Sequence, residues 1–337
     1  MVTSGVVDIA QITAADFRDI PATITVIGVG GGGCNVIIRM AEGKPIPGIR
    51  YVCVNTDVKS LGKAPAGSKL VYIGERLTHG MGAGGNVQVG AEAAVTGVDA
   101  IKEAAKGSDL VFITVGMGGG TGTGAAPIVA EAAKSTGAMV IGIATTPFSW
   151  EGSRRVETAF AGMSELKSKV DNLIVVHNDR ILNLCPPNTA IKEALKVADQ
   201  VVMQGILSVA ELINVPGDIN VDLADVKTIM NLKGRALMAV GESRGAGAAL
   251  VAAQTAVANP LVNLSIDGAK GLLFNLKGSS KLTLGDMNAV GEFIAGKVDQ
   301  QATIFFGMVS DEDLEDRVRI TVIATGIPVN SEKKKDS

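Results

Sequence analysis

The chain reads VFITVGMGGGTGTGAAPIV from Val111 to Val129. Residues 110–115 form an apolar, β-branched run typical of a buried strand, and residues 121–135 have a helical pattern. Residues 116–124, GMGGGTGTG, join them and contain six glycines with two interleaved threonines. Glycines let backbone N–H groups approach an anion closely, and the start of a helix adds a favourable dipole. The stretch therefore predicts a strand, a phosphate-binding loop and a helix in direct succession.

A second glycine loop follows the first expected strand. Residues 23–27 run into GVGGGGCN at residues 28–35, which fits the pattern G-x-G-x-x-G. Alone, this loop would also suit a dinucleotide-binding enzyme, with Asp57 after the next strand as the acid that binds ribose. Two such loops at adjacent strand ends are instead suited to holding a triphosphate from two sides. The chain has no G-x-x-x-x-G-K-[ST] sequence, which excludes a lysine-bearing P-loop.

Short apolar strands alternate with longer helical patterns through the first half of the chain. The expected strands cover residues 23–27, 50–55, 69–73, 110–115, 139–144 and 173–176. Helical patterns lie between them, for example at residues 87–106. This alternation predicts a doubly wound, mostly parallel sheet of the α/β class, which binds phosphate ligands at the carboxyl ends of its strands.

The second half of the chain begins with a long helix, expected at residues 189–213 from apolar side chains at three- and four-residue spacing. Helices at 247–258 and 286–297 then alternate with strands near 235–241, 272–276, 303–309 and 318–325. The last two strands follow one another directly, which favours a mixed sheet in a smaller α+β domain. We expect a flexible tail (1–22), a nucleotide-binding domain (23–188), a central helix with its following loop (189–221), a second domain (222–328) and a disordered tail (329–337).

Composition excludes several classes of function. The 337 residues carry a net charge of −3 and no basic stripe, so we expect no nucleic-acid partner. Three scattered cysteines and two histidines favour a reducing compartment, without a disulfide framework and without a protein metal site of thiols or imidazoles. The chain has neither a secretory signal pattern nor an apolar run of membrane-spanning length, so we expect a cytoplasmic protein without direct membrane insertion.

The heptapeptide GGGTGTG at residues 118–124 resembles the signature of the tubulin/FtsZ family of GTPases. Other pieces are similar to the same family in the same order: Val54-Asn55-Thr56-Asp57, Pro147-Phe148, Glu151-Gly152 with Arg155, Asn178-Asp179, Pro216-Gly217, Asn220 to Asp225 and Val322 to Gly326. The resemblance covers about residues 23–328 and is nearer to the FtsZ branch than to eukaryotic tubulin. It implies a cytoskeletal protein at the division site that binds and hydrolyses GTP and assembles head to tail into filaments of the cell-division ring.

The resemblance also implies a nucleotide site, residue by residue. GTP or GDP, with Mg²⁺ accompanying it, is expected to contact Gly31, Gly32, Gly33, Cys34, Asn35, Gly118, Gly119, Gly120, Thr121, Gly122, Glu151, Arg155, Asn178 and Asp199. The glycine loops would hold the phosphates, while Glu151 and Arg155 contact ribose and phosphate, a role that suits the planar arginine fork. The Asp199 carboxylate would accept hydrogen bonds from guanine N1–H and N2–H₂, which explains a preference for GTP, and Asn178 would add a base contact.

Two acids, Asp222 and Asp225, match the family's loop that completes the active site of the neighbouring subunit. The resemblance implies that they polarise the water that attacks the γ-phosphate and help to position a cation. Taken without the resemblance, the same pair is a common helix N-cap with a first-turn acid.

The chain departs from the family pattern in ways that bear on function. Cys34 stands where many relatives have glycine, and Leu195 stands where many stack an aromatic ring on the guanine. The usual C-terminal peptide that binds membrane tethers is not seen before Ser337, although membrane-tethering and division proteins remain expected partners. Two alternative functions stay open on the sequence: an NAD-dependent Rossmann oxidoreductase, which explains only the first loop, and a tubulin-like paralogue that binds nucleotide without hydrolysing it.

Overall fold

The computed structural model of the chain describes residues 22–43, 46–181, 185–186, 188–215, 217–258 and 265–328. The tails expected at residues 1–22 and 329–337 fall outside these ranges, except for Ala22. In chain order, the first part contains β1 (Ile24–Val29), α1 (Gly30–Met40), β2 (Ile49–Asn55), α2 (Val58–Leu61), β3 (Lys69–Tyr72), α3 (Glu75–Thr78), α4 (Val87–Thr96), α5 (Val98–Ala105), β4 (Leu110–Gly116), α6 (Gly120–Lys134), β5 (Met139–Thr146), α7 (Ser153–Lys169), β6 (Asn172–His177) and α8 (Asn178–Ile181). The remainder contains α9 (Ile191–Asn214), α10 (Leu223–Met230), β7 (Arg235–Arg244), α11 (Ala248–Ala258), β8 (Gly271–Gly278), α12 (Leu284–Ala295), β9 (Thr303–Ser310) and β10 (Arg317–Ile327).

Within the described ranges, ten strands are hydrogen-bonded in the order β3-β2-β1-β4-β5-β6-β7-β10-β8-β9. All pairs from β3 to β6 are parallel, which confirms the doubly wound parallel sheet. Strand β10 runs antiparallel to β7 and β8, whereas β8 and β9 are parallel, which confirms the mixed sheet of the second part. A single register pair, Ile174 with Ala236, joins β6 to β7. The two parts are therefore continuous through one narrow connection in the sheet.

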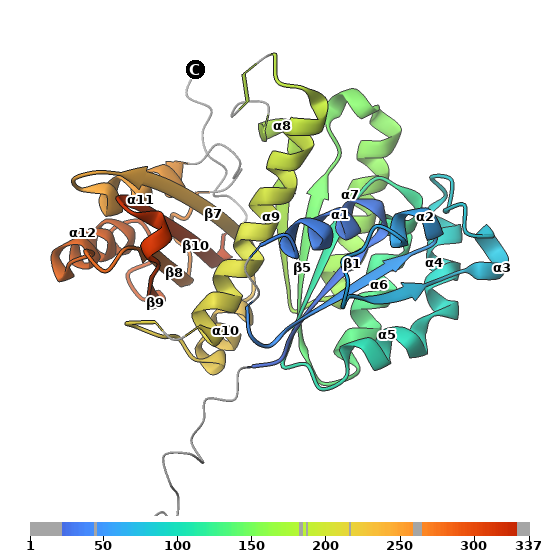
Figure 1. Cartoon of the computed structure of the whole chain (residues 1–337), viewed down its shortest axis with the longest axis horizontal. Coiled ribbons are helices and arrows are strands. Elements are labelled where there is room, and N and C mark those ends of the chain that lie inside the picture. The colour runs from blue at the N-terminus through green and yellow to red at the C-terminus, as the bar shows by residue number, and fades with distance from the viewer. Residues whose placement is uncertain are drawn as a thin grey trace, which may run out of the picture.

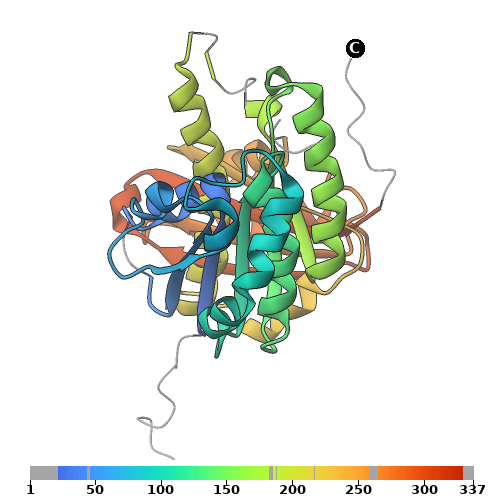
Figure 2. The same cartoon turned by 90° about the vertical axis from the view of Figure 1, so that its right-hand side faces the viewer.

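Helices cover both faces of the parallel strands (Figures 1 and 2). One buried cluster joins α1, α9 and α10 to one face of the sheet, and a second joins α4, α5, α6 and α7 to the opposite face. Helices α11 and α12 cover the second part through a third cluster. Aliphatic side chains dominate all three clusters, as a chain with few aromatics requires. No helix in the described ranges is both long and apolar enough to cross a membrane.

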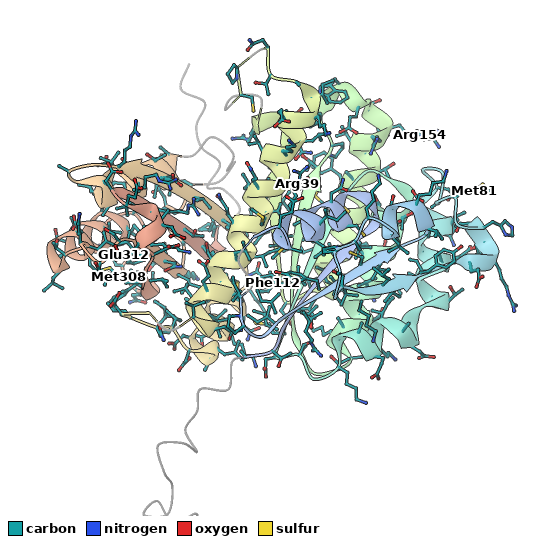
Figure 3. The ribbon with its side chains drawn as sticks, in the orientation of Figure 1. Arg39, Met81, Phe112, Arg154, Met308 and Glu312 are labelled. Atoms are coloured by element: carbon teal, nitrogen blue, oxygen red, sulfur yellow. The ribbon has the colours of Figure 1, made fainter. Side chains whose placement is uncertain are left out.

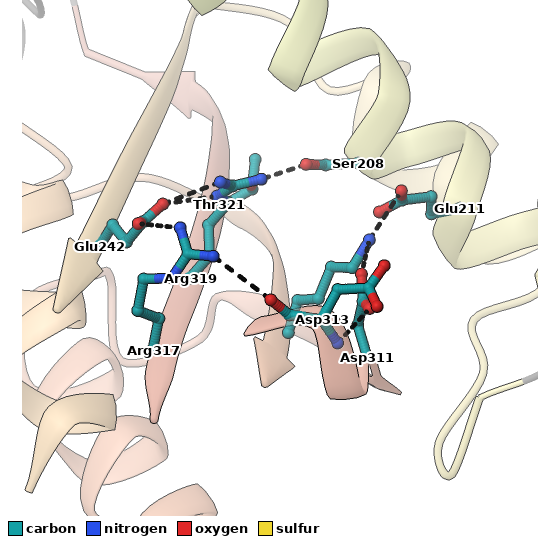
Figure 4. Close-up of polar contacts among 9 residues, drawn as sticks. Ser208, Glu211, Glu242, Asp311, Asp313, Arg317, Arg319 and Thr321 are labelled. Carbon is teal, nitrogen blue, oxygen red and sulfur yellow. Dashed lines mark hydrogen bonds and ion pairs between the residues drawn. The ribbon is translucent and has the colours of Figure 1, made fainter. Parts of the chain in front are cut away.

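Helix α9 runs between the two parts of the molecule (Figure 1). Its 24 residues give it a length of about 36 Å, at about 1.5 Å per residue. Polar contacts fasten its C-terminal half to the second part (Figure 4): Ser208 Oγ lies 2.7 Å from Thr321 Oγ1, and Lys277 Nζ lies 2.9 Å from Glu211 Oε1. The helix predicted at residues 189–213 is therefore confirmed and has contacts on both sides.

One expected helix is wrong in its extent. The helical pattern at residues 87–106 is interrupted at Gly97, where α4 ends and α5 begins. A Cβ atom at Gly97 would lie 2.4 Å from Ile73 Cγ2, so the chain passes too close to β3 for a side chain. This contact between distant segments leaves no trace in the periodicity of the pattern.

Candidate nucleotide-binding site

A cavity of about 600 Å³ opens at the carboxyl ends of β4, β5 and β6, between α1 and α9. Its walls contain Gly32, Asn35, Ile38, Arg39, Glu42, Gly116, Met117, Thr145, Thr146, Pro147, Glu151, Arg155, Asn178, Lys192, Leu195, Lys196 and Asp199. Six of the residues predicted for nucleotide binding belong to this wall: Gly32, Asn35, Glu151, Arg155, Asn178 and Asp199. The cavity thus lies where a doubly wound sheet binds phosphate ligands.

The first glycine loop begins at Gly30, whose φ of +69° starts α1 directly after β1. Gly31, Gly32 and Asn35 are exposed, and a Cβ atom at Gly31 would meet nothing within 4 Å. Gly33 is different, because a Cβ atom there would lie 2.2 Å from the carbonyl oxygen of Thr114 in β4. Gly31 therefore leaves the backbone open to a ligand, whereas a Cβ atom at Gly32 would lie 3.2 Å from Gly116 Cα. Gly33 allows α1 to pack on the sheet.

The second glycine loop follows β4 and leads into α6. Gly118 has a φ of +93°, and its N–H donates a hydrogen bond of 2.9 Å to Thr123 Oγ1 in the first turn of α6. Gly119 has an extended backbone, and a Cβ atom there would meet nothing within 4 Å. A Cβ atom at Gly120 or Gly122 would come within 2.8 Å of backbone atoms. The loop therefore packs against backbone atoms at Gly120 and Gly122 and is open at Gly119.

Thr121, the other polar residue predicted in this loop, contacts the loop after β2. Its Oγ1 lies 2.7 Å from Thr56 Oγ1, and one hydroxyl donates to the other. This bond ties the second glycine loop to the turn that follows Asn55, whose side-chain nitrogen is buried without a partner. Polar groups from the ends of β2 and β4 therefore meet beside the glycine loops.

Glu151 and Arg155 form one side wall of the cavity. Glu151 Oε1 accepts a 2.9 Å hydrogen bond from the Phe148 N–H, and Glu151 Oε2 lies 2.9 Å from Arg155 Nη1. About half of the Arg155 side chain is exposed. Its remaining N–H groups are therefore free to donate to an anion while Glu151 fixes its direction.

Asp199 of α9 and Arg39 of α1 belong to another part of the cavity wall. Figure 3 labels Arg39. Arg39 Nε donates a 2.8 Å hydrogen bond to Asp199 Oδ2. Burial raises the pKa of the Asp199 carboxyl above its usual range, and the hydrogen bond and charge of Arg39 partly offset this. Arg39 thus favours the ionised form, the one that accepts hydrogen bonds from a ligand.

Asn178 lies at the end of β6 and is 7% exposed. Its N–H donates to Thr146 Oγ1 at 3.3 Å, but its side-chain oxygen has no partner. A buried, unsatisfied acceptor on a cavity wall is suited to a donor on a ligand. Leu195 also belongs to this wall and is 41% exposed, so an apolar surface is available there to a ring.

Asp222 and Asp225 lie away from this cavity, after the other end of α9. Asp222 is the N-cap of α10, and its Oδ1 accepts a 2.7 Å hydrogen bond from the Asp225 N–H. From Asp199 to Asn214, the last residue of α9, the helix rises about 22 Å. The two acids and the cavity are therefore separated within one chain.

Sequence reasoning missed two features of the site. Arg39 was not singled out, although it is the cation that pairs with Asp199. The Cys34 side chain, expected near the nucleotide, is 2% exposed and turns toward β2, so only its backbone faces the loop. A basic residue on the polar side of α1 was the available signal for Arg39. No sequence signal gives the direction of the Cys34 thiol.

The site's features fit a guanine nucleotide: two open glycine positions for phosphates, a basic and acidic side wall, and a paired carboxylate with an unpartnered amide oxygen for a base. Comparison with known proteins agrees. Residues 23–186 match the Tubulin/FtsZ family, GTPase domain, and residues 234–328 match the FtsZ family, C-terminal domain.

Solved structures give the same result. An empty FtsZ dimer of M. jannaschii is 41% identical, with a TM-score of 0.87 and coverage of 94% of this chain and 93% of that one. A point mutant of the M. jannaschii FtsZ is 43% identical, with a TM-score of 0.86 and coverage of 91% and 92%. CetZ2 from Haloferax volcanii, solved as a GTPγS-bound protofilament, has a TM-score of 0.77 at 19% identity over 92% and 94%, which shows a shared fold. The chain belongs to the tubulin/FtsZ family of GTPases.

Proposed function

We propose that this protein is a filament-forming cell-division GTPase whose active site is completed by the next subunit of a head-to-tail filament. The observation that carries the proposal is the separation of Asp222 and Asp225 from the nucleotide cavity by the part of α9 that follows Asp199. The carboxylates on the cavity wall are Glu42, Glu151 and Asp199. Glu151 is bonded to Arg155, and Asp199 is bonded to Arg39, so neither of these two is free to activate water.

The nucleotide's orientation follows from the chemistry of the two ends. Gly31 and Gly119 offer open backbone for phosphate oxygens. Asp199 accepts hydrogen bonds from the two guanine donors, N1–H and N2–H₂, whereas adenine presents an acceptor at N1. The Asn178 oxygen takes a further donor. Recognition of GTP and GDP over adenine nucleotides is therefore assigned to the α9 end of the cavity.

Hydrolysis requires a group that takes the proton from the attacking water. In the proposed filament, the α10 N-terminus of one subunit meets the cavity of the next, and Asp222 and Asp225 polarise the water there. The water oxygen bonds to the γ-phosphorus, the bond to the β-γ bridging oxygen breaks, and GDP and phosphate are released. A bound Mg²⁺ would supply charge neutralisation to the phosphates, and the Thr56 and Thr121 hydroxyls are oxygen donors of the kind it accepts.

Self-association is supported by relatives solved as a dimer and as a protofilament. A head-to-tail contact uses two different surfaces of the subunit, so it propagates into a filament unless a rotation closes it into a ring. We place the filament in the cytoplasm at the division site, with membrane-tethering and division proteins as further partners. The oxidoreductase alternative is not supported, because a dinucleotide fold leaves the second glycine loop unexplained.

The test is to mix two inactive proteins. Asp222→Ala/Asp225→Ala keeps the nucleotide cavity and lacks the two acids. Gly119→Trp keeps the acids and fills the phosphate end, and its fold is expected to survive because a Cβ atom at Gly119 meets nothing within 4 Å. Each alone is expected to hydrolyse GTP at background, while mixtures regain activity that peaks at intermediate ratios.

The matched control is Asp218→Ala, which removes a third acid of the same loop. The Asp218 carboxylate accepts a 2.6 Å hydrogen bond from Ser310 Oγ in an exposed contact, so this variant is expected to hydrolyse GTP on its own. Circular dichroism and sedimentation establish that the mixed proteins are folded and associate. Folded, associating mixtures that stay at background at every ratio contradict a shared site.

Dilution gives an independent measurement. Turnover per subunit is expected to rise from near zero as assembly begins, because a lone subunit lacks the acids. A turnover per subunit that stays constant down to concentrations without assembly contradicts the shared site.

A further inference from the structure

A second cavity, of about 750 Å³, lies where the two parts of the sheet meet. Its wall contains residues 231–237, which lead into β7, together with Leu173 and Val175, the two neighbours of Ile174 in β6. Ile174 forms the single register pair with Ala236 that joins β6 to β7. The cavity therefore spans the narrow connection between the two parts of the molecule.

This cavity is on the face of the sheet opposite α9. Side chains alternate between the two faces of a strand, and Ile174 packs in the buried cluster that includes α9, whereas Leu173 and Val175 pack against the cluster that includes α7. Met163 of α7 belongs to that second cluster, and Leu237 of β7 belongs to the cluster of α11 and α12. Both lie on the cavity wall, so the cavity lies between these two clusters. It shares no described wall residue with the nucleotide cavity.

Apolar side chains from three elements line the cavity. Phe160 and Met163 lie three residues apart on one side of α7. Leu173 and Val175 of β6 and Leu237 of β7 add further apolar surface. Phe160 is 58% exposed, so much of its ring is accessible. Small-molecule sites have volumes of about 300–1,000 Å³ and mostly apolar walls, so this cavity is suited to a ligand with an apolar body.

Two cations and one acid stand on the same wall. Lys167 of α7 and Lys233, in the turn before β7, are exposed, and neither side chain has a hydrogen-bond or ion-pair partner among the described residues. The acid, Asp171, is already paired: its carboxylate lies 2.6 Å from Lys134 Nζ and accepts a 2.8 Å hydrogen bond from the Val140 N–H. The wall therefore offers unpaired positive charge beside apolar surface.

We propose that this cavity binds a small organic anion that has an apolar body and one carboxylate. The apolar body packs on the Phe160 and Leu173 side chains, and the carboxylate lies at Lys167 and Lys233. Lysine covers apolar surface with its stem and keeps its ammonium group in water, so the anion is bound without full desolvation of its charge. The ligand contacts α7 and the turn before β7 at once and so bridges the two parts of the molecule. This second site does not depend on the proposed function.

Dansylglycine and dansylglycinamide test the assignment, because they share the apolar dansyl ring and differ in one carboxylate. Fluorescence titration of the full chain is expected to show one site for dansylglycine, with the blue-shifted emission of an apolar environment. Exposed lysine–carboxylate pairs contribute little each, so the carboxylate is expected to bind about 5-fold more tightly than the amide, and by less at high salt. Lys167→Gln/Lys233→Gln is expected to abolish this preference. Lys102→Gln, which changes an exposed lysine of α5 outside the cavity wall, is expected to keep it.

A variant that fills the cavity locates the site. Ser164 is exposed on α7 and belongs to the cavity wall, so Ser164→Trp occupies the cavity without removing a buried side chain. This variant is expected to bind both dansyl compounds about 10-fold more weakly or worse, because the ring covers the apolar surface. Ser168→Trp, one turn further along α7 and outside the wall, is expected to bind both like the parent. Circular dichroism checks that both variants are folded.

Cleavage by trypsin gives an independent measurement. The Lys233–Gly234 bond is exposed and belongs to the cavity wall. With dansylglycine at ten times its Kd, the rate of cleavage at this bond is expected to fall about 10-fold, because the unliganded protein is the form that is cleaved. Cleavage after Lys63, which is exposed and outside the cavity wall, is the internal control and is expected to keep its rate.

Excess GDP is expected to leave the Kd of dansylglycine unchanged, since the two cavities share no described wall residue. Dansylglycine that GDP displaces, or that binds folded Ser164→Trp as tightly as the parent, overturns the proposal. Equal affinities for dansylglycine and its amide in the parent overturn the assignment to an anion. Displacement by a peptide of residues 329–337, or loss of binding when the protein self-associates without nucleotide, assigns the cavity to another segment of the chain or to a second copy and also overturns the proposal.

Discussion

Removing the Asp199 carboxylate tests the proposal that this end of the cavity recognises the base. In Asp199→Ala, both proposed hydrogen bonds to guanine N1–H and N2–H₂ would be lost. A hydrogen bond to a charged group contributes about 1.5–3 kcal/mol. Asp199 is 16% exposed and already shares one oxygen with Arg39, so we take the lower end for each bond and expect a loss of about 3 kcal/mol. This corresponds to a fall in GDP affinity of roughly 150-fold.

Calorimetry with GDP and inosine diphosphate separates base reading from general damage. Inosine lacks the N2 amino group, so the parent is expected to prefer GDP, and Asp199→Ala is expected to bind both equally. Gln200→Ala is the matched control, because Gln200 is exposed on the same helix and is absent from the cavity wall. Arg39 loses its partner in Asp199→Ala but is 25% exposed, so unfolding is expected to become easier by no more than about 1 kcal/mol. An Asp199→Ala protein that still prefers GDP to inosine diphosphate refutes the assignment.

Three further outcomes are expected. Leu195→Phe should tighten GDP binding by about 1 kcal/mol through stacking on the base, whereas Ile191→Phe, on the same helix but outside the cavity wall, should not; equal affinities for both variants and the parent would put Leu195 out of reach of the base. Gly33→Ala should lower the free energy of unfolding by at least about 2 kcal/mol, because its Cβ would overlap the backbone of β4, while Gly31→Ala should change it by less than about 0.5 kcal/mol in the same urea titration. GDP affinity should be full above the pKa of Asp199 and fall as the pH drops through it. An exposed Asp titrates at about pH 4, and because burial raises the pKa of Asp199, the fall in affinity should begin at a higher pH than that; calorimetry across pH checks it.

The fold was largely predictable because its signals are local. The alternation of apolar runs and helical patterns identified the parallel strands, and the spacing of apolar residues identified α9 to within two residues at each end. The break at Gly97 was not predictable, since it depends on the close approach of Ile73, the residue after β3. The joining of β6 to β7 through a single register pair also depends on tertiary packing, and no pattern in either strand indicates it.

The candidate site divides in the same way. The glycine loops could be predicted from the sequence because glycine is the residue type that lets backbone N–H groups approach a phosphate closely. Their separate tasks were not: Gly31 and Gly119 are open, whereas Gly33 serves packing against β4. Pairings across the fold, such as Arg39 with Asp199 and the unpartnered oxygen of Asn178, require coordinates, because the residues are far apart in sequence.

Helix α9 makes the proposed link between assembly and hydrolysis a matter of geometry. Its first half supplies Asp199 to the cavity, and the chain beyond its last residue supplies Asp222 and Asp225, about 22 Å or more further along. A rigid helix of this length prevents one subunit from bringing both ends of its own chemistry together. In a head-to-tail filament, each contact therefore completes one site, and the number of complete sites is one fewer than the number of subunits. The subunit whose cavity is uncovered binds and exchanges nucleotide without hydrolysing it, so the filament's two ends differ in nucleotide state even when every subunit has the same sequence.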